Sequence, residues 1–146
     1  MDPQDYYEQI FIPNFNDTDA HPLDIRHAFN AAIAAYHFYE HFWHHCPQNS
    51  QYYSKLRTLT NEHDYRKSLA NKCPEFALIW DVADASRHAE LRSSKKRELF
   101  SSDQIHERGG AFDSSFSRGF DIGRIVIEDN SGKEYDFFET LKAVKL

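Results

Sequence analysis

The segment from Pro22 to Cys46 constrains the fold of this chain most, because it combines a helical pattern with apolar residues around most of the helix. At about 3.6 residues per turn, alanine and aromatic side chains fill nearly the whole circumference and leave one narrow polar stripe. This stripe consists of Arg26, Asn30, His37, His41 and His44. A helix that is apolar on most sides is normally buried, and a buried polar group needs a partner. The sequence therefore predicts a second element that pairs with the stripe.

A second helix with the same property is predicted over residues 75–93. Asp81, Asp84, His88 and Arg92 fall on one stripe of it, and apolar residues occupy the other positions. Because the first stripe is basic or titratable and the second is mostly acidic, we expect the two to face each other in the interior. We call this expected arrangement the polar seam, and its members are Arg26, Asn30, His37, His41, His44 and Asp81.

The remaining pattern predicts a mainly α fold, a small helical bundle with a C-terminal β-hairpin, built as one domain over residues 1–146. With 40% hydrophobic and 15% aromatic residues, the chain can bury a core. The expected parts are an irregular acidic N-terminal segment (1–21), a helical bundle core (22–93), a loop-rich segment (94–121), a β-hairpin (122–138) and a short helix (139–146). The hairpin prediction rests on alternating apolar residues on both sides of Asp129-Asn-Ser-Gly132. These four residues are of the types that strongly favour a turn.

Charge is unevenly distributed along the chain. Residues 1–24 contain six acidic residues and no Lys or Arg, so the remaining residues carry 17 charges of each sign. The one basic cluster includes Lys95, Lys96 and Arg97, which makes it a candidate patch for RNA. Such clusters are more often solvated loops, and the balanced charge argues against nonspecific binding to duplex DNA.

The sequence lacks the signals of membrane insertion and export. It has no long apolar run, and its first residues lack a basic start followed by an apolar block. We therefore expect a cytosolic protein without membrane association, and we expect it to form a homodimer through a helix face. No glycine-rich phosphate loop occurs, so no organic cofactor is expected.

Three interpretations of the polar seam remain open. In the first, it is a structural hydrogen-bonded network that fixes the register of the two helices. In the second, it binds a divalent metal, because helical bundles build metal sites from inward-facing imidazoles and carboxylates. The expected metal ligands are His37, His41, His44, Asp81 and Asp84. In the third, the seam belongs to a nuclease-like site.

The third interpretation comes from a resemblance that covers mainly residues 22–91. A small bundle with a polar motif on a core helix and an appended hairpin resembles the HEPN-type proteins of bacteria and phage, several of which act in defence. Ribonucleases of that family carry an Arg followed several residues later by a His. Arg57 and His63 have this spacing, whereas Asp84 and His88 lie on the core helix where the motif is expected, with Asp81 in place of the Arg.

The resemblance implies one of two activities. With an intact motif, the family performs metal-independent RNA cleavage, in which the Arg polarises the phosphate and the His moves the proton of the ribose 2′-hydroxyl. A chain that keeps the bundle without the motif would act in binding or regulation, with a protein or an RNA as its partner. The departure at Asp81 favours the second alternative.

Overall fold

The computed structural model describes residues 1–88, 91, 97–111 and 122–145, and it confirms a mainly helical fold with a C-terminal β-hairpin. The helices are α1 (Pro3–Tyr6), α2 (Ile12–Ala20), α3 (Ile25–His45), α4 (Tyr53–Leu56), α5 (Glu62–Lys72), α6 (Pro74–Ala85) and α7 (Phe137–Val144). The strands are β1 (Ile105–Arg108), β2 (Arg124–Glu128) and β3 (Glu134–Asp136).

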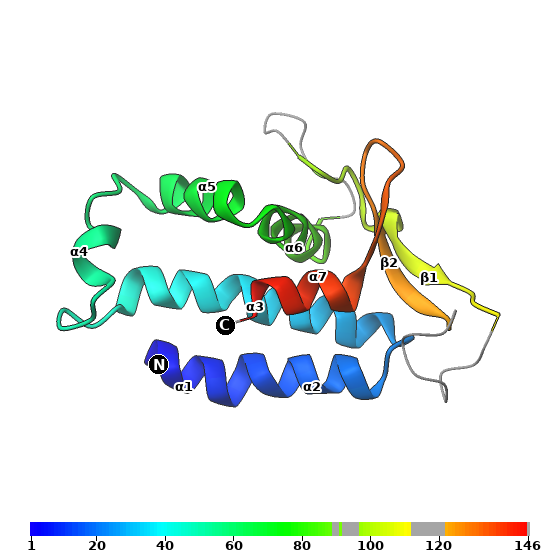
Figure 1. Cartoon of the computed structure of the whole chain (residues 1–146), viewed down its shortest axis with the longest axis horizontal. Coiled ribbons are helices and arrows are strands. Elements are labelled where there is room, and N and C mark those ends of the chain that lie inside the picture. Colours follow the sequence, from blue (N-terminus) through cyan, green and yellow to red (C-terminus); the bar gives the residue numbers. More distant parts are fainter. Residues whose placement is uncertain (89–90, 92–96, 112–121, 146) are drawn as a thin grey trace.

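Helix α3 is the central element of the molecule. Figure 1 shows it along the long axis, with α1 and α2 on one side, α5 and α6 on the other, α7 beside it and the sheet at the end where α3 begins. Five alanines of α3 are buried, namely Ala28, Ala31, Ala32, Ala34 and Ala35. Because alanine occupies little space, helices can approach α3 closely from several directions, and α2, α6 and α7 all pack against it.

The N-terminal segment is helical, which corrects the expectation of an irregular segment over 1–21. α1 and α2 are joined by a π-helical turn at Tyr7–Phe11, so the chain is helical from residue 3 to residue 20. Pro13 cannot donate a backbone hydrogen bond, and the wide turn directly before it accommodates this loss. The helix forms because Phe11 and Phe15, four residues apart, are buried against the bundle, where Phe11 stacks on Phe38 at 6.1 Å between ring centroids.

The two core helices form where the sequence predicts them, but both are shorter. Helix α3 begins at Ile25, after the Asp24 side chain accepts a hydrogen bond from the backbone N–H of Arg26, and it ends at His45 before Cys46-Pro47. Helix α6 ends at Ala85, where the Ser86 hydroxyl donates to the carbonyl oxygen of Ala83 at 2.6 Å and competes with the next helical turn. Among the described residues, no helix has both the length and the apolar character needed to cross a membrane.

The sheet contains the predicted hairpin and one strand that was not predicted. β2 is central and pairs antiparallel with β1 on one side and β3 on the other. The turn between β2 and β3 has Gly132 at φ 84°, and the Asp129 carboxylate accepts hydrogen bonds from the backbone N–H groups of Ser131 and Lys133. β1 lies in the segment that we expected to be a loop. The sequence did not predict this strand because Ile105 is its only buried residue, so apolar and polar residues do not alternate along it.

Candidate functional site

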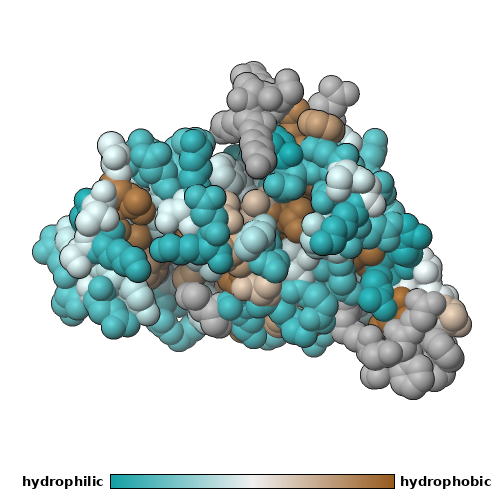
Figure 2. Space-filling view, turned by 45° about the horizontal axis from the view of Figure 1, so that its top comes forward, coloured by the Kyte–Doolittle hydropathy of each residue, from teal (hydrophilic) through white to brown (hydrophobic). Residues whose placement is uncertain are grey.

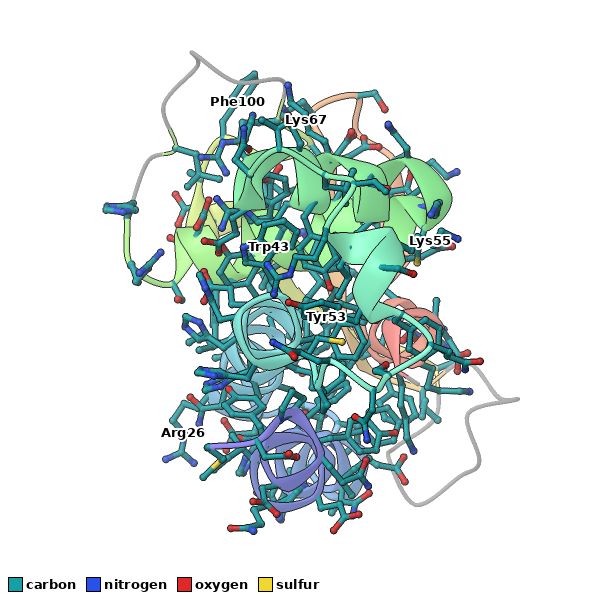
Figure 3. The ribbon with its side chains drawn as sticks, turned by 90° about the vertical axis from the view of Figure 1, so that its left-hand side faces the viewer. Arg26, Trp43, Tyr53, Lys55, Lys67 and Phe100 are labelled. Carbon is teal, nitrogen blue, oxygen red and sulfur yellow. The ribbon has the colours of Figure 1, made fainter. Side chains whose placement is uncertain are left out.

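The polar seam does not form, because the stripe on α3 lies away from α6. The Arg26 side chain is 81% exposed and pairs with Asp24 next to it, at 2.6 Å from Nη2 to Oδ2. Figure 3 shows Arg26 pointing outward from the molecule. Asn30 is also exposed. The physical reason is that other residues of α3 contact α6: the ring centroids of Tyr36 and Trp80 are 6.4 Å apart, and those of Tyr39 and Phe76 are 5.0 Å apart.

Each histidine of the stripe has a neighbour of its own. His37 bonds to Glu40 one turn later on α3, and the ring of His41 stacks on Tyr6 of α1 at 4.4 Å between centroids. With these contacts, the imidazole rings of His37 and His41 lie at the edge of the bundle.

His44 is exposed, and its Nε2 lies 3.2 Å from Glu62 of α5. The structure therefore does not bring His37, His41 and His44 together with Asp81 and Asp84, and the metal site expected from these five residues is not assembled.

The acidic pair on α6, buried Asp81 and half-buried Asp84, has a different cationic partner, Arg97. Nη1 of Arg97 donates to Asp81 at 2.9 Å and to Asp84 at 2.6 Å. The second carboxylate oxygen of Asp81 accepts from the backbone N–H groups of Glu98 at 2.7 Å and Leu99 at 3.2 Å. All four hydrogen bonds come from one short segment. Residues 97–99 therefore bind the acidic pair, whose partners were expected on α3.

Burial and pairing act in opposite directions on these charges. Burial raises the pKa of the Asp81 carboxyl, and the hydrogen bond from Arg97 and the backbone N–H groups oppose this rise. Burial also works against the charged form of Arg97, but the carboxylates of Asp84 and Asp81 prevail and raise the pKa of the guanidinium. Arg97 was expected to belong to an RNA-binding patch, yet its side chain is only 10% exposed. Lys95 and Lys96 lie outside the described residues.

The residues implied by the nuclease resemblance are also separated. His88 follows the end of α6 and is exposed, and only its backbone N–H bonds to the carbonyl oxygen of Asp84, at 3.1 Å. The expectation that His88 faces the interior with the rest of its stripe is therefore wrong.

Arg57 and His63 likewise have different neighbours. The Arg57 guanidinium lies over the rings of Trp43 and Tyr53, at 5.4 and 5.0 Å from their centroids. The His63 ring instead meets Trp80 edge-on at 6.3 Å. The two side chains therefore do not share a ligand position.

Three expected site residues, His63, Asp81 and Arg97, do line a cavity. A groove of about 600 Å³ runs between α5, α6, the segment that contains Arg97 and strand β3. We call it the α5–α6 groove; its lining includes His63, Lys67, Asn71, Glu75, Ala77, Leu78, Trp80, Asp81, Arg97, Glu98 and Tyr135. In Figure 2, apolar side chains on this side of the molecule are visible between hydrophilic ones.

The groove residues share helix faces, and this pattern could have been found in the sequence. His63, Lys67 and Asn71 are spaced four residues apart on α5, so they lie on one face of that helix. On α6, Ala77 and Asp81 are also four apart. What the spacing does not reveal is that these two faces meet, or that residues 97, 98 and 135 close the groove.

Trp80 forms an aromatic wall of the groove, and residues of α3 and α5 hold it in place. The guanidinium of Arg66 lies 5.3 Å from the ring of Trp80 and donates to the hydroxyl of Tyr36 at 2.9 Å. It also pairs with Glu62, one turn earlier on α5, at 2.9 Å. These contacts tie α3, α5 and α6 together around Trp80, so the wall is preorganised.

The groove combines an apolar floor with charges of both signs. Leu78 is buried and Ala77 is half-buried, whereas Lys67 and Asn71 are exposed at the rim. Nε of Arg97 is buried and has no hydrogen-bond partner among the described residues. Such a site is suited to a ligand with an apolar part and polar groups, and none of its described lining residues is arranged as a nucleophile with an adjacent base.

No family model, curated protein or solved structure matches this chain.

Proposed function

We propose that this chain is a binding module that receives a short peptide segment of a partner protein in the α5–α6 groove. The observation that carries the proposal is the groove itself, which has an apolar floor, a polar rim and a volume of about 600 Å³. This volume is within the range of about 300–1,000 Å³ that is usual for ligand sites. An apolar side chain of the peptide would cover Ala77 and Leu78, and its backbone would bond to rim groups such as Asn71.

The charge of the groove favours a peptide over a nucleic acid. Three acidic residues line it, Glu75, Asp81 and Glu98, against the two cations Lys67 and Arg97. Arg97 is already bound to two carboxylates. A phosphate backbone would thus meet a surface with little free positive charge, which is unfavourable because nucleic-acid affinity depends mainly on cations that contact phosphates.

Binding also suits the chain better than catalysis. Arg57 and His63 have separate neighbours, so this pair is not poised for proton transfer to RNA. Asp84 is neutralised by Arg97, so the pair of Asp84 and His88 is not poised for it either. The proposal thus takes up the binding alternative of the HEPN resemblance, and RNA cleavage stays a prediction of the other alternative.

A peptide-display selection against the full chain tests the proposal. The matched variants are Ala77→Arg, which places a large side chain in the groove, and Ala143→Arg, which makes the same change at an exposed position of α7. We expect selected peptides to bind wild type and Ala143→Arg equally, and Ala77→Arg about tenfold more weakly or worse, which corresponds to about 1.4 kcal/mol. Calorimetric titration measures these affinities.

Two results would contradict the proposal. One is a selection in which no peptide distinguishes Ala77→Arg from Ala143→Arg. The other is a single-stranded RNA oligonucleotide that binds wild type and is lost in Ala77→Arg, since the groove would then belong to a nucleic-acid ligand. Circular dichroism of both variants confirms that they remain folded.

A further inference from the structure

The outer face of the sheet brings three metal-ligating side chains together, one from each strand. They are His106 of β1, Glu128 of β2 and Glu134 of β3. One ligand atom of each residue, an imidazole nitrogen or a carboxylate oxygen, lies within 4.8 Å of the corresponding atoms of the other two. In the described part of the chain, this is the one group of three or more such residues that meets this distance.

The strand register explains why these side chains converge. Glu128 and Glu134 are directly opposite each other across β2 and β3. His106 is opposite Val126, two residues before Glu128, so its side chain is on the same face of the sheet. Three hydrogen-bonded strands therefore fix the spacing, and a site on strands is held more firmly than one on loops.

The two ring nitrogens of His106 have different neighbours, and this orientation allows a cation to bind between the ring and the carboxylates. Nδ1 of His106 faces the backbone carbonyl oxygen of Glu107 at 3.4 Å, whereas Nε2 faces the carboxylate of Glu128 at 3.4 Å. With the proton on Nδ1, the lone pair of Nε2 points at a negatively charged oxygen. Metal-binding histidines commonly show this arrangement, in which the second ring nitrogen bonds to a carbonyl oxygen and fixes the tautomer.

A bound cation would also reduce the repulsion between Glu128 and Glu134. Like charges directly opposite each other destabilise a pair of strands. In the structure, Arg108 pairs with Glu134 and thereby offsets part of this repulsion. A divalent ion bound by both carboxylates would remove the repulsion and leave Arg108 as a neighbouring counter-charge.

We propose that His106, Glu128 and Glu134 bind one divalent ion of the zinc class. One imidazole and two carboxylates suit Zn²⁺, whereas Mg²⁺ and Ca²⁺ prefer oxygen ligands alone. Zinc bonds of about 2.0–2.2 Å require the ligand atoms to move closer together, and the side chains are 36%, 42% and 30% exposed, which leaves them room to rotate. Water completes the coordination, and the site does not depend on a ligand in the α5–α6 groove.

Calorimetric titration of the full chain with ZnCl₂ tests the site, with His106→Ala and Glu134→Gln as site variants. The matched control is His44→Ala, because His44 is also an exposed imidazole near one glutamate, Glu62, at 3.2 Å. We expect one Zn²⁺ per chain in wild type and His44→Ala, and at least about tenfold weaker binding in both site variants. MgCl₂ should give no saturable binding.

Titration with Co²⁺ gives a second readout, because tetrahedral Co²⁺ with nitrogen and oxygen ligands absorbs visible light. We expect this band in wild type and His44→Ala, and its loss in His106→Ala. The proposal is overturned if no saturable Zn²⁺ binding occurs. It is also overturned if His106→Ala binds as wild type does, since the nine histidines of the chain would then bind zinc nonspecifically.

Discussion

The acidic pair of α6 and the polar stripe of α3 look alike in the sequence but differ in the structure. On α6, the Asp81 side chain is 6% exposed and its partner Arg97 is 10% exposed. On α3, Arg26 is 81% exposed, and its ion pair is with Asp24, two residues earlier in the chain. Periodicity thus identifies which residues share a helix face. Whether another segment covers that face decides whether the charges are buried and contribute to the stability of the fold.

This difference has a clear energetic meaning. An exposed ion pair contributes about 0–1 kcal/mol, because water solvates its charges almost as well. A buried charge has lost that solvation, so removal of its partner is costly. Substitutions in the two regions should therefore change the free energy of unfolding by very different amounts.

The largest effect is expected for Arg97→Met. This change leaves Asp81 buried without its cation, and we expect the free energy of unfolding to fall by about 3–5 kcal/mol. The matched change on α3, Arg26→Met, should leave it almost unchanged, because the side chain is 81% exposed. Urea denaturation measures both, and equal losses would show that the two regions do not differ as described.

A smaller loss is expected for Asp84→Asn. Arg97 keeps its bond to Asp81 in this variant, and the Asp84 side chain is partly accessible, at 13% exposure. We expect the free energy of unfolding to fall by about 1.5–3 kcal/mol, which is typical of a hydrogen bond to a charged group. Urea denaturation in parallel with Arg97→Met gives the comparison. A loss as large as that of Arg97→Met would mean that Asp84, rather than Asp81, is the main partner.

A pH-dependent effect is expected for His41, a residue of the stripe whose Nδ1 is buried. Burial, together with the nearby His45, lowers the pKa of His41. A base with a lowered pKa stabilises the fold above its ordinary pKa of about 6.5, and this stability is lost as pH falls through the lowered value. We therefore expect wild type to lose stability on acidification across this range, and His41→Phe to lose less.

The control for this experiment is His44→Phe. The His44 side chain is 56% exposed, so this variant makes the same substitution at an open position of α3. Phenylalanine at position 41 can still stack on Tyr6. Urea denaturation at a series of pH values provides the data, and identical slopes for wild type and His41→Phe would count against the role of His41.

The smallest effect, and one of opposite sign, is expected for Asn30→Ala. Asn30 is exposed within α3, and alanine has the higher helix propensity. We expect the free energy of unfolding to rise by about 0.5 kcal/mol, as measured by thermal and urea denaturation. A clear loss of stability would mean that Asn30 makes a buried contact.

Local signals in the sequence were sufficient for much of the fold. Pro47 ends the first core helix, Pro74 begins the second, and the residues from Asp129 to Gly132 form the hairpin turn. The N-terminal helix was missed because Pro13 and the many acids suggest irregular structure, although Phe11 and Phe15 have helical spacing. β1 was missed because an edge strand with one buried residue has no detectable alternation.

The candidate site was less predictable, because it depends on contacts between distant segments. His63 was named as a site residue, and it does line the groove, but for a reason other than the Arg–His spacing. The partner of Asp81 is 16 residues away along the chain, and no periodic pattern extends from α6 to Arg97. Nothing in the sequence alone shows that residues 97–99 return to this helix.

The return of residues 97–99 to α6 fixes the two ends of the segment that connects the helices to the sheet. Ala85 ends α6, and Arg97, Glu98 and Leu99 are bonded to Asp81 on the same helix. When both ends of a connection are held, doubling its length adds only about 0.6 kcal/mol of closure entropy. Arg87 and His88, the exposed residues between α6 and buried Leu91, are therefore a position where an insertion should be tolerated in evolution or used to attach a reporter.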